Sequence, residues 1–506
     1  MPIDSTHMDY DKSTTDWKLI RDTVEGQTKI KGEGQLYLPA PPGSLILNTP
    51  VQVAPEGGVV GVQSRYAFYK SFAKFPEIVT PALNGMQGII HTKDPEITLP
   101  SKMEYLLEEA TPDGKTLINL WEDITREILQ TGRLGLLVEL FGDSPVLCRY
   151  EAETLINWKV RPKRFGGQPE FIVLTEKIWL VDPKDEFAPA LITRYRILRF
   201  DGTNYTVQAF DKINDEFVPV ELEGTDPATG RVTPVLMGKA FGFMPFTVVN
   251  AVMEGFSIGP MPFLPLSRRA LNIYQKSATF ERSLYLKGDP TVVITGIDPK
   301  KSPTTIGGGS AWVFPDPETK VTMLDIDGDG IPLQRDSIKD EYEYFYQEGG
   351  RLLDTRDRSV ESGKALERRE INHNVSLIAI AVNGAGGMQN ALRQIAVLLN
   401  VDPEEVEFNA NLDFTLPTMS GKELVEFTKA KNQGAPISNE TIHEMMKRRN
   451  ITTKSFEEEQ AAIDEEPEDM GGFGRAVPQL GSTGDQDGPG NTSGTGDPAE
   501  GGGDNE

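Results

Sequence analysis

The sequence is short of the residues from which redox and metal chemistry are built. It has a single cysteine, Cys148, and four scattered histidines among 506 residues. One cysteine excludes an intrachain disulfide framework and a multi-cysteine zinc site. The histidines, which are His7, His91, His373 and His443, disfavour a histidine-built metal centre. We therefore expect no bound cofactor.

Long hydrophobic runs are also missing. No stretch of eighteen apolar residues occurs, which predicts no transmembrane helix and no membrane partner. The first residues, MPIDSTHMDYDKSTTDW, lack the basic and apolar regions of a secretory signal. We expect the chain to assemble in an intracellular, reducing environment.

The common catalytic motifs are absent, which favours a non-enzymatic role. Residues 362–365 contain the Gly-Lys pair of a phosphate-binding loop. However, Arg358 stands where that motif needs its first glycine, and Ala365 replaces the hydroxyl that binds Mg²⁺. No GxSxG or HExxH motif occurs either.

Positive charge is scarce, and its deficit is uneven. The chain has 51 basic and 76 acidic residues, for a net charge of −25. The segment 456–506 carries −13 of this total, which leaves −12 on the preceding 455 residues. An acidic body argues against tight, non-specific binding of nucleic acid. From about residue 466 the chain is rich in Gly, Pro, Asp and Glu, which predicts disorder.

Hydrophobic periodicity predicts a mixed chain of helices and strands. The polar start, 1–15, is expected to be flexible. Predicted helices cover 63–75, 80–90 (broken by Gly85 and Gly88), 117–131 (ended by Gly132), 266–287, a segment N-capped by Ser337, 363–399 (interrupted at 383–387), 421–433 and a segment from Ser438. Predicted strands cover 134–141, a meander over 145–250, a three-stranded unit at 291–295, 311–314 and 320–326, and 406–416.

One segment has part of the spacing of a calcium loop. Asp325, Asp327 and Asp329 alternate as in the first half of that motif, and Asp336 falls at its twelfth position. The twelfth ligand is normally a glutamate, and a strand rather than a helix precedes the loop. We therefore favour a polar turn that leads into a helix N-terminus, where acidic residues are stabilising, and keep calcium as the alternative.

The order of elements is more informative than any single motif. A β-rich region feeds a long helix, a small β-unit, a second helix, a charged loop and a further long helix. Several stretches in this order resemble portal proteins of tailed bacteriophages, in a branch catalogued as a domain of unknown function. They include YAFYKSFAKFPEIVTPALNGMQGIIHTKDPEI (66–97), SRRALNIYQKSATFERSLYLKGDPTVVITG (267–296), ESGKALERREI (361–371) and NQGAPISNETIHEMMKRRNI (432–451).

The resemblance implies an α+β portal fold assembled as a ring, typically of twelve copies. Its parts would be a flexible N-terminal arm (1–19), the first part of a β-rich wing (20–263), a stem helix (264–288), a small α/β clip (289–332), a second stem helix (333–350), a tunnel loop (351–363), the wing's long helix and strand (364–432), a helical crown (433–465) and a disordered acidic tail (466–506). The tunnel loop departs from a plain polar loop because it contains Leu352 and Leu353.

The resemblance also implies where DNA and protein partners would contact the chain. In the tunnel loop and directly after it, the candidates for the DNA channel are Arg351, Arg356, Asp357, Arg358 and Lys364; the alternative is that these charges pair with neighbouring subunits. In the clip, Lys300, Lys301 and Trp312 are candidates for docking the terminase or the adaptor, although Trp312 could equally be a core residue.

The first stem helix has a surplus of positive charge. Its candidates are Arg268, Arg269, Lys276 and Arg282. They could line the channel, or they could meet the acidic second helix, which contains Asp336, Asp340, Glu341 and Glu343. We favour the second interpretation, because oppositely charged helices that pack together need no further explanation.

The implied function is a conduit at the unique vertex of a capsid, assembled in the cytoplasm of a bacterial host and retained in the virion. Double-stranded DNA would pass through it during packaging and ejection. Its partners would be further copies of itself, the large terminase subunit, the head–tail adaptor, and the major capsid and scaffold proteins. The alternative is another virion structural protein, of the tail or baseplate, without a DNA channel.

Overall fold

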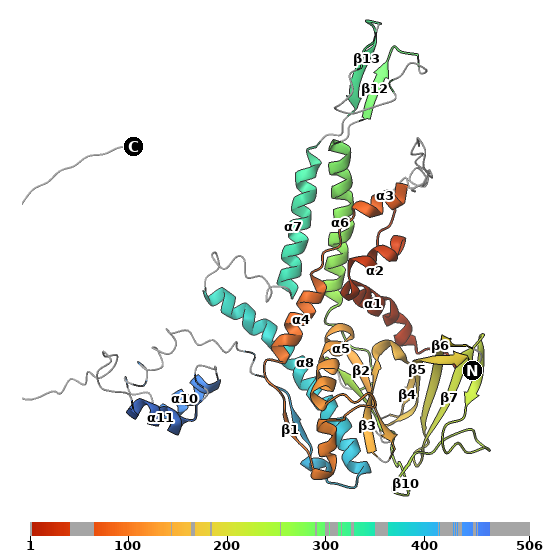
Figure 1. Cartoon of the computed structure of the whole chain (residues 1–506), viewed down its shortest axis with the longest axis vertical. Coiled ribbons are helices and arrows are strands. Elements are labelled where there is room, and N and C mark those ends of the chain that lie inside the picture. The colour runs from red at the N-terminus through yellow and green to blue at the C-terminus, as the bar shows by residue number, and fades with distance from the viewer. Residues whose placement is uncertain are drawn as a thin grey trace, which may run out of the picture. The chain divides into compact units, whose positions relative to one another are not determined.

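The computed structural model describes residues 3–40, 65–142, 144–162, 167–182, 185–252, 255–288, 291–298, 303, 312–314, 316–324, 328–349, 363–412, 414, 429, 431, 433, 438–448, 452 and 454–465. The chain divides into two units, Met1–Phe414 and Thr415–Glu506. The first unit is mixed α+β, with several small antiparallel sheets (Figure 1).

The first helix, α1 (Met8–Glu25), corrects the prediction of a flexible arm over 1–19. The Nδ1 atom of His7 caps the helix by accepting a hydrogen bond from the amide of Asp9. Trp17 is fully buried, and its indole donates to the carbonyl oxygen of Thr131 at 3.2 Å. The prediction missed this helix because the segment is mostly polar. Only one face of the helix, with Trp17 and Ile20, is buried.

Further α-helices of the body follow α1 along the chain. They are α2 (Gln27–Gly32), α3 (Arg65–Phe72), α4 (Val79–Ile90) and α5 (Leu117–Thr131). The bounds of α5 and its end at Gly132, which has a φ of 80°, confirm the prediction. Helix α4 runs without a break through Gly85 and Gly88.

Two main sheets replace the single meander predicted for 145–250. The first has the order β11–β2–β3 and the second the order β4–β5–β6–β7–β8, and every neighbouring pair is antiparallel. Their strands are β2 (Arg133–Phe141), β3 (Ser144–Glu151), β4 (Leu155–Val160), β5 (Pro169–Asp182), β6 (Asp185–Phe200), β7 (Tyr205–Ile213), β8 (Glu216–Val220) and β11 (Phe246–Asn250). A short 3₁₀ helix, Ala152–Thr154, separates β3 from β4 and breaks the meander.

Smaller elements form separate two-stranded sheets and the described helices of the second unit. They are β1 (Glu96–Thr98), which pairs with β14 (Glu407–Asn409), β9 (Val235–Leu236), which pairs with β10 (Lys239–Ala240), and the helices α10 (Asn439–Arg448) and α11 (Phe456–Glu465). Strand β14 is shorter than the predicted strand 406–416. The helix predicted to start at Ser438 is α10, and Ser438 caps it, since its Oγ accepts from the amide of Thr441 at 2.9 Å. The predicted tail, 466–506, and most of the predicted helix 421–433 lie outside the described residues.

Helix α8 (Gly363–Leu398) is continuous, which corrects the predicted interruption at 383–387. The glycines there serve close packing. A Cβ atom on Gly384 would lie 2.9 Å from Cδ1 of Ile128, and one on Gly387 would lie 2.7 Å from two methyl groups of Val249. Both glycines therefore let α8 approach α5 and β11 closely without ending the helix.

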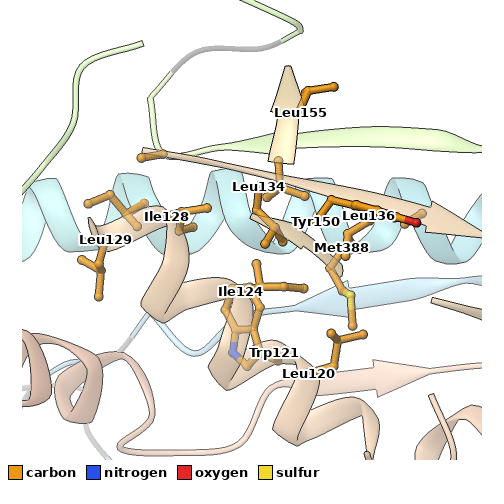
Figure 2. Packing of buried hydrophobic residues seen from close by; sticks show 14 of the residues in the cluster. Leu120, Trp121, Ile124, Ile128, Leu129, Leu134, Leu136, Tyr150, Leu155 and Met388 are labelled. Atoms are coloured by element: carbon orange, nitrogen blue, oxygen red, sulfur yellow. The ribbon is translucent and has the colours of Figure 1, made fainter. Parts of the chain in front are cut away.

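The core lies where α5, α8 and the β2 sheet meet. Figure 2 shows Leu120, Trp121, Ile124 and Ile128 of α5 together with Met388 of α8, and all five are at most 1% exposed. Strand β2 contributes Leu134 and Leu136, both fully buried. This packing makes the long helix α8 part of the same body as the sheet.

Two neighbouring glycines of α8 provide a test of this packing. We expect Gly387→Ala to lower the free energy of unfolding by about 1–3 kcal/mol, because the stiff side chain of Val249 must shift to admit the methyl group. Gly386→Ala is the matched control. It has open space around its Cβ position and should raise stability by about 0.5–1 kcal/mol through helix propensity. Urea unfolding measures both, and equal effects would contradict the close-packing role.

Candidate functional site

The candidate site is a pair of long helices joined through a two-stranded tip. Helix α6 (Leu264–Gly288) has 25 residues, a length of about 37 Å, and confirms the predicted helix 266–287. Helix α7 (Gly330–Glu348) packs alongside it, and β12 (Thr291–Thr295) and β13 (Lys320–Leu324) lie between them in sequence (Figure 1). We refer to α6 and α7 as the stem pair.

The prediction that Ser337 begins the second helix is wrong. Helix α7 starts at Gly330, directly after Asp329, and Ser337 lies inside it. Pro332 is tolerated because it falls in the first turn, where a helix has no internal partner for the amide hydrogen anyway. The Oγ of Ser337 instead accepts a hydrogen bond from Nζ of Lys276 on α6, at 2.8 Å.

Charge pairs join the two stem helices, as the favoured interpretation expected. Nζ of Lys276 lies 2.8 Å from Oε1 of Glu341, and Nη1 of Arg269 lies 3.2 Å from Oε2 of the same carboxylate. Arg269 also pairs with Glu348 at 3.0 Å. The ring of Tyr344 covers the Arg269 guanidinium, 5.0 Å from its centre. One carboxylate of α7 therefore holds two cations of α6.

Glu341 is the central group of this contact. Its side chain is 11% exposed. Burial acts to raise its pKa, but the hydrogen bonds from Lys276 and Arg269 outweigh burial, so the pKa lies below the ordinary 4.5. The hydrogen bond to Glu348 raises the pKa of Arg269. Both charges therefore persist at neutral pH, and the contact is an ion pair there.

The other two stem candidates form no ion pair with α7 among the described residues. Arg268 pairs with Asp16 of α1 at 2.9 Å. Arg282 is exposed, and it forms no ion pair with any residue that the structure describes. Sequence reasoning could not separate these four basic residues, since all of them lie on one helix and differ only in their position around it.

The base of α6 is anchored to the body by polar contacts. The hydroxyl groups of Ser267 and Thr23 are hydrogen-bonded at 2.8 Å and are buried. Further along, Oγ of Ser277 accepts from the amide of Lys74 at 2.9 Å, and Nζ of Lys74 pairs with Glu281 at 2.6 Å. These contacts fix α6 against α1 and against the segment that follows α3.

The tip is a hairpin with one apolar face. Its register places Val292 opposite Met323 and Ile294 opposite Val321. Because side chains alternate along a strand, these four residues share one face. Met323 is 64% exposed and Val321 is 43% exposed. Among the described residues β12 and β13 pair only with each other.

The predicted third strand of the tip is not formed over its described part. Residues 312–314 have no strand geometry, so the strand predicted at 311–314 is wrong over these residues. Trp312 is half-buried and is neither the fully buried core residue nor the fully exposed anchor that were considered. Lys300 and Lys301 lie outside the described residues.

The tunnel-loop candidates also lie outside the described part of the chain. These are Arg351, Arg356, Asp357 and Arg358. Lys364 falls in the first turn of α8, but its side chain is not described. Their role in a channel stays a prediction.

The acidic turn before α7 has only part of its residues described. Asp325 and Asp327 lie outside the described residues, Asp329 precedes the helix, and Asp336 is exposed in its second turn. Among the described residues, no group of three or more His, Cys, Asp or Glu could hold a metal ion. Within the same residues, no helix is long and apolar enough to span a membrane.

Sequence reasoning missed the partly buried charge networks of the body. Arg196 of β6 contacts Glu139 of β2 and lies 3.4 Å from Glu176 of β5. Tyr150 donates to Glu176 at 2.6 Å, and Sγ of Cys148 lies 3.4 Å from Glu139. Burial and the nearby Glu139 raise the pKa of the Cys148 thiol, so it stays protonated. The signal that could have revealed these networks is the presence of charged residues within otherwise apolar strands.

A second network joins α1 to α5. Arg21 pairs with Glu127 at 2.5 Å and with Glu153 at 2.9 Å. Burial raises the pKa of Glu127, and the Arg21 charge acts against this effect. Such a buried pair is costly to break, because either partner alone would leave an uncompensated charge. The network therefore orients α1, which in turn contacts α6.

A part of the chain matches a family model. Residues 262–398 match a family described as "Domain of unknown function (DUF4055)". The matched stretch covers the stem pair, the tip and α8 up to its last residue. No curated protein matches the chain.

Solved structures show a distant likeness to chains of a gene transfer agent particle. One, from "Virion of native gene transfer agent (GTA) particle", is 10% identical, with a TM-score of 0.38, and the match covers 80% of this chain and 98% of that chain. Another, from "Neck of native GTA particle computed with C12 symmetry", is 11% identical, with a TM-score of 0.37 and coverage of 74% and 90%. A third, from the neck of the empty particle, is 11% identical, with a TM-score of 0.37 and coverage of 73% and 89%.

The stem pair can be tested through its central carboxylate. We expect Glu341→Gln to lower the free energy of unfolding at pH 7 by about 1–3 kcal/mol, since the neutral amide has one acceptor oxygen instead of two and turns an N–H donor toward one of the cations. Because the folded-state pKa of Glu341 lies below 4.5, its stabilisation is present above that pH. The difference between variant and wild type should therefore shrink as the pH falls below 4.5.

The matched control is Glu343→Gln, an exposed carboxylate two residues away on the same helix. It should unfold within about 0.5 kcal/mol of the wild type at every pH. Denaturant unfolding across the pH range compares the two. A loss in the Glu341 variant that stays constant down to low pH would contradict the ion-pair account.

Proposed function

We propose that this chain is a portal protein, a structural subunit of a ring through which double-stranded DNA enters and leaves a capsid. The observation that supports this most strongly is the order and packing of α6, β12, β13, α7 and α8. A long helix leaves the body, a small hairpin follows, a second helix returns alongside the first, and a third long helix packs into the body core. A stem with a tip is the shape that the portal role requires.

The stem pair is built to keep its shape without help from a large core. Only a few residues of α7, including Phe345, are buried, so hydrophobic burial contributes modestly to this contact. The charge pairs of Glu341 with Lys276 and Arg269 hold the two helices in register instead. A stiff pair of this kind would make a wall segment, and copies arranged in a ring would make a channel.

The charge of the chain fits transit of DNA rather than tight binding. Each phosphate that a basic residue neutralises adds affinity through counterion release, which would slow sliding. Residues 1–455 carry −12, so a ring of about twelve copies would present a strongly negative field. In solution at physiological salt this field acts over about 8 Å, which is enough to keep a duplex away from a channel wall.

In this proposal the tip formed by β12 and β13 is the docking platform for the large terminase subunit and later for the head–tail adaptor. Its apolar face, with Val292, Ile294, Val321 and Met323, offers a surface that a protein partner can bury. The body would contact the major capsid and scaffold proteins at the capsid vertex. The tunnel loop, 351–363, would face the DNA.

Electron microscopy and native mass spectrometry of the purified protein test the proposal. We expect closed rings of about twelve copies with a central opening, as a repeated heterologous contact that closes requires. A stable monomer, or an open stacked tube, would contradict the portal role. A tube would favour a component of the tail or the baseplate.

A further inference from the structure

Four exposed charges of α7 form two neighbouring stripes, and the exposed Glu343 follows one turn after Lys339. Arg335 and Lys339 lie one turn apart, and so do Asp336 and Asp340. All four are exposed. At 100° per residue, the acidic stripe lies about 100° around the helix from the basic stripe. Ser337 and Glu341 face α6, so the basic stripe points away from α6 and the acidic stripe lies to one side of α7.

Within each stripe this arrangement is unfavourable. Like charges four residues apart repel each other on a helix, whereas surface helices usually place opposite charges at that spacing. Strong ion pairs within the chain do not offset this repulsion between like charges. Lys339 lies 3.6 Å from Asp336, and both side chains are more than half exposed. Arg335 and Asp340 form no ion pair with any residue that the structure describes.

We propose that the two stripes are the two halves of a contact between copies of this chain, in which Asp336 and Asp340 of one copy face Arg335 and Lys339 of the next. This inference rests on the proposed ring and names the surface that closes its stem. A second copy is the occupant because the charge complementarity is contained in one helix.

Ring symmetry supplies the geometric reason. In a cyclic ring every copy is related to the next by a rotation about one axis, so equivalent residues lie at the same height. A heterologous contact then joins two different patches of the same surface. The stripes are compatible with both conditions, because they span the same two turns of α7 and are centred about 100° apart around it. Each contact between copies would bring two positive and two negative charges together.

Two charge-reversal variants of the full chain test the proposal. The first, called the basic variant, is Asp336→Lys with Asp340→Lys, and both of its stripes are positive. The second, called the acidic variant, is Arg335→Glu with Lys339→Glu, and both of its stripes are negative. Each variant alone should lose rings at least about tenfold relative to wild type by native mass spectrometry, because like stripes meet at every contact.

Mixing the two variants distinguishes a broken contact from a misfolded chain. Where the variants alternate, every contact joins a positive stripe to a negative stripe. An equimolar mixture should therefore restore rings that contain equal numbers of the two variants. High salt should weaken ring formation by the wild type and by the mixture, since exposed charges are screened.

The control is Glu221→Lys with Glu223→Lys, which makes the same change of charge at exposed positions far from α7 in sequence. It should form rings as the wild type does. The proposal is overturned if either reversed variant alone forms rings at the wild-type level, or if the mixture forms none while both variants keep the wild-type circular dichroism. Failure of the wild type itself to form rings would contradict the proposed function instead.

Discussion

The contact of Glu341 with Lys276 and Arg269 is the interaction on which the stem depends. Helices α6 and α7 extend from a body that buries most of its apolar residues elsewhere, so they share little hydrophobic surface. A buried carboxylate that holds two cations fixes their register, because shifting either helix by one turn would leave that carboxylate unpaired. This register also sets the positions of the tip and of the exposed face of α7.

The body holds this stem through polar rather than purely apolar contacts. Buried hydroxyls of Ser267 and Thr23 tie α6 to α1, and Arg21 ties α1 to Glu127 of α5. Helix α5 in turn packs against α8, where Gly384 permits a close approach to Ile128. A chain of specific contacts therefore leads from the core to the stem.

Much of the local structure could be predicted, and the misses have common physical causes. The bounds of α5 and its end at Gly132 followed from amphipathic spacing and the need for a left-handed residue. The segment NGAGG (383–387) was interpreted as a break, although position 387 needs a glycine because Val249 leaves no room for a side chain. Ser337 was interpreted as a cap, although its partner is Lys276, which is 61 residues away. In each case a long-range contact overrode a local preference.

The sequence by itself determined the mixed α+β class, the order of the stem and tip elements, and the division of acidity between body and tail. These properties depend on periodicity, turn residues and composition, which are local or additive. Only the tertiary structure decided which basic residues of α6 pair with α7, and that Arg268 pairs with Asp16 of α1 instead. It also decided that α7 leaves a positive and a negative stripe exposed. Those outcomes depend on the rotation of one helix against another, which is set by packing across distant segments.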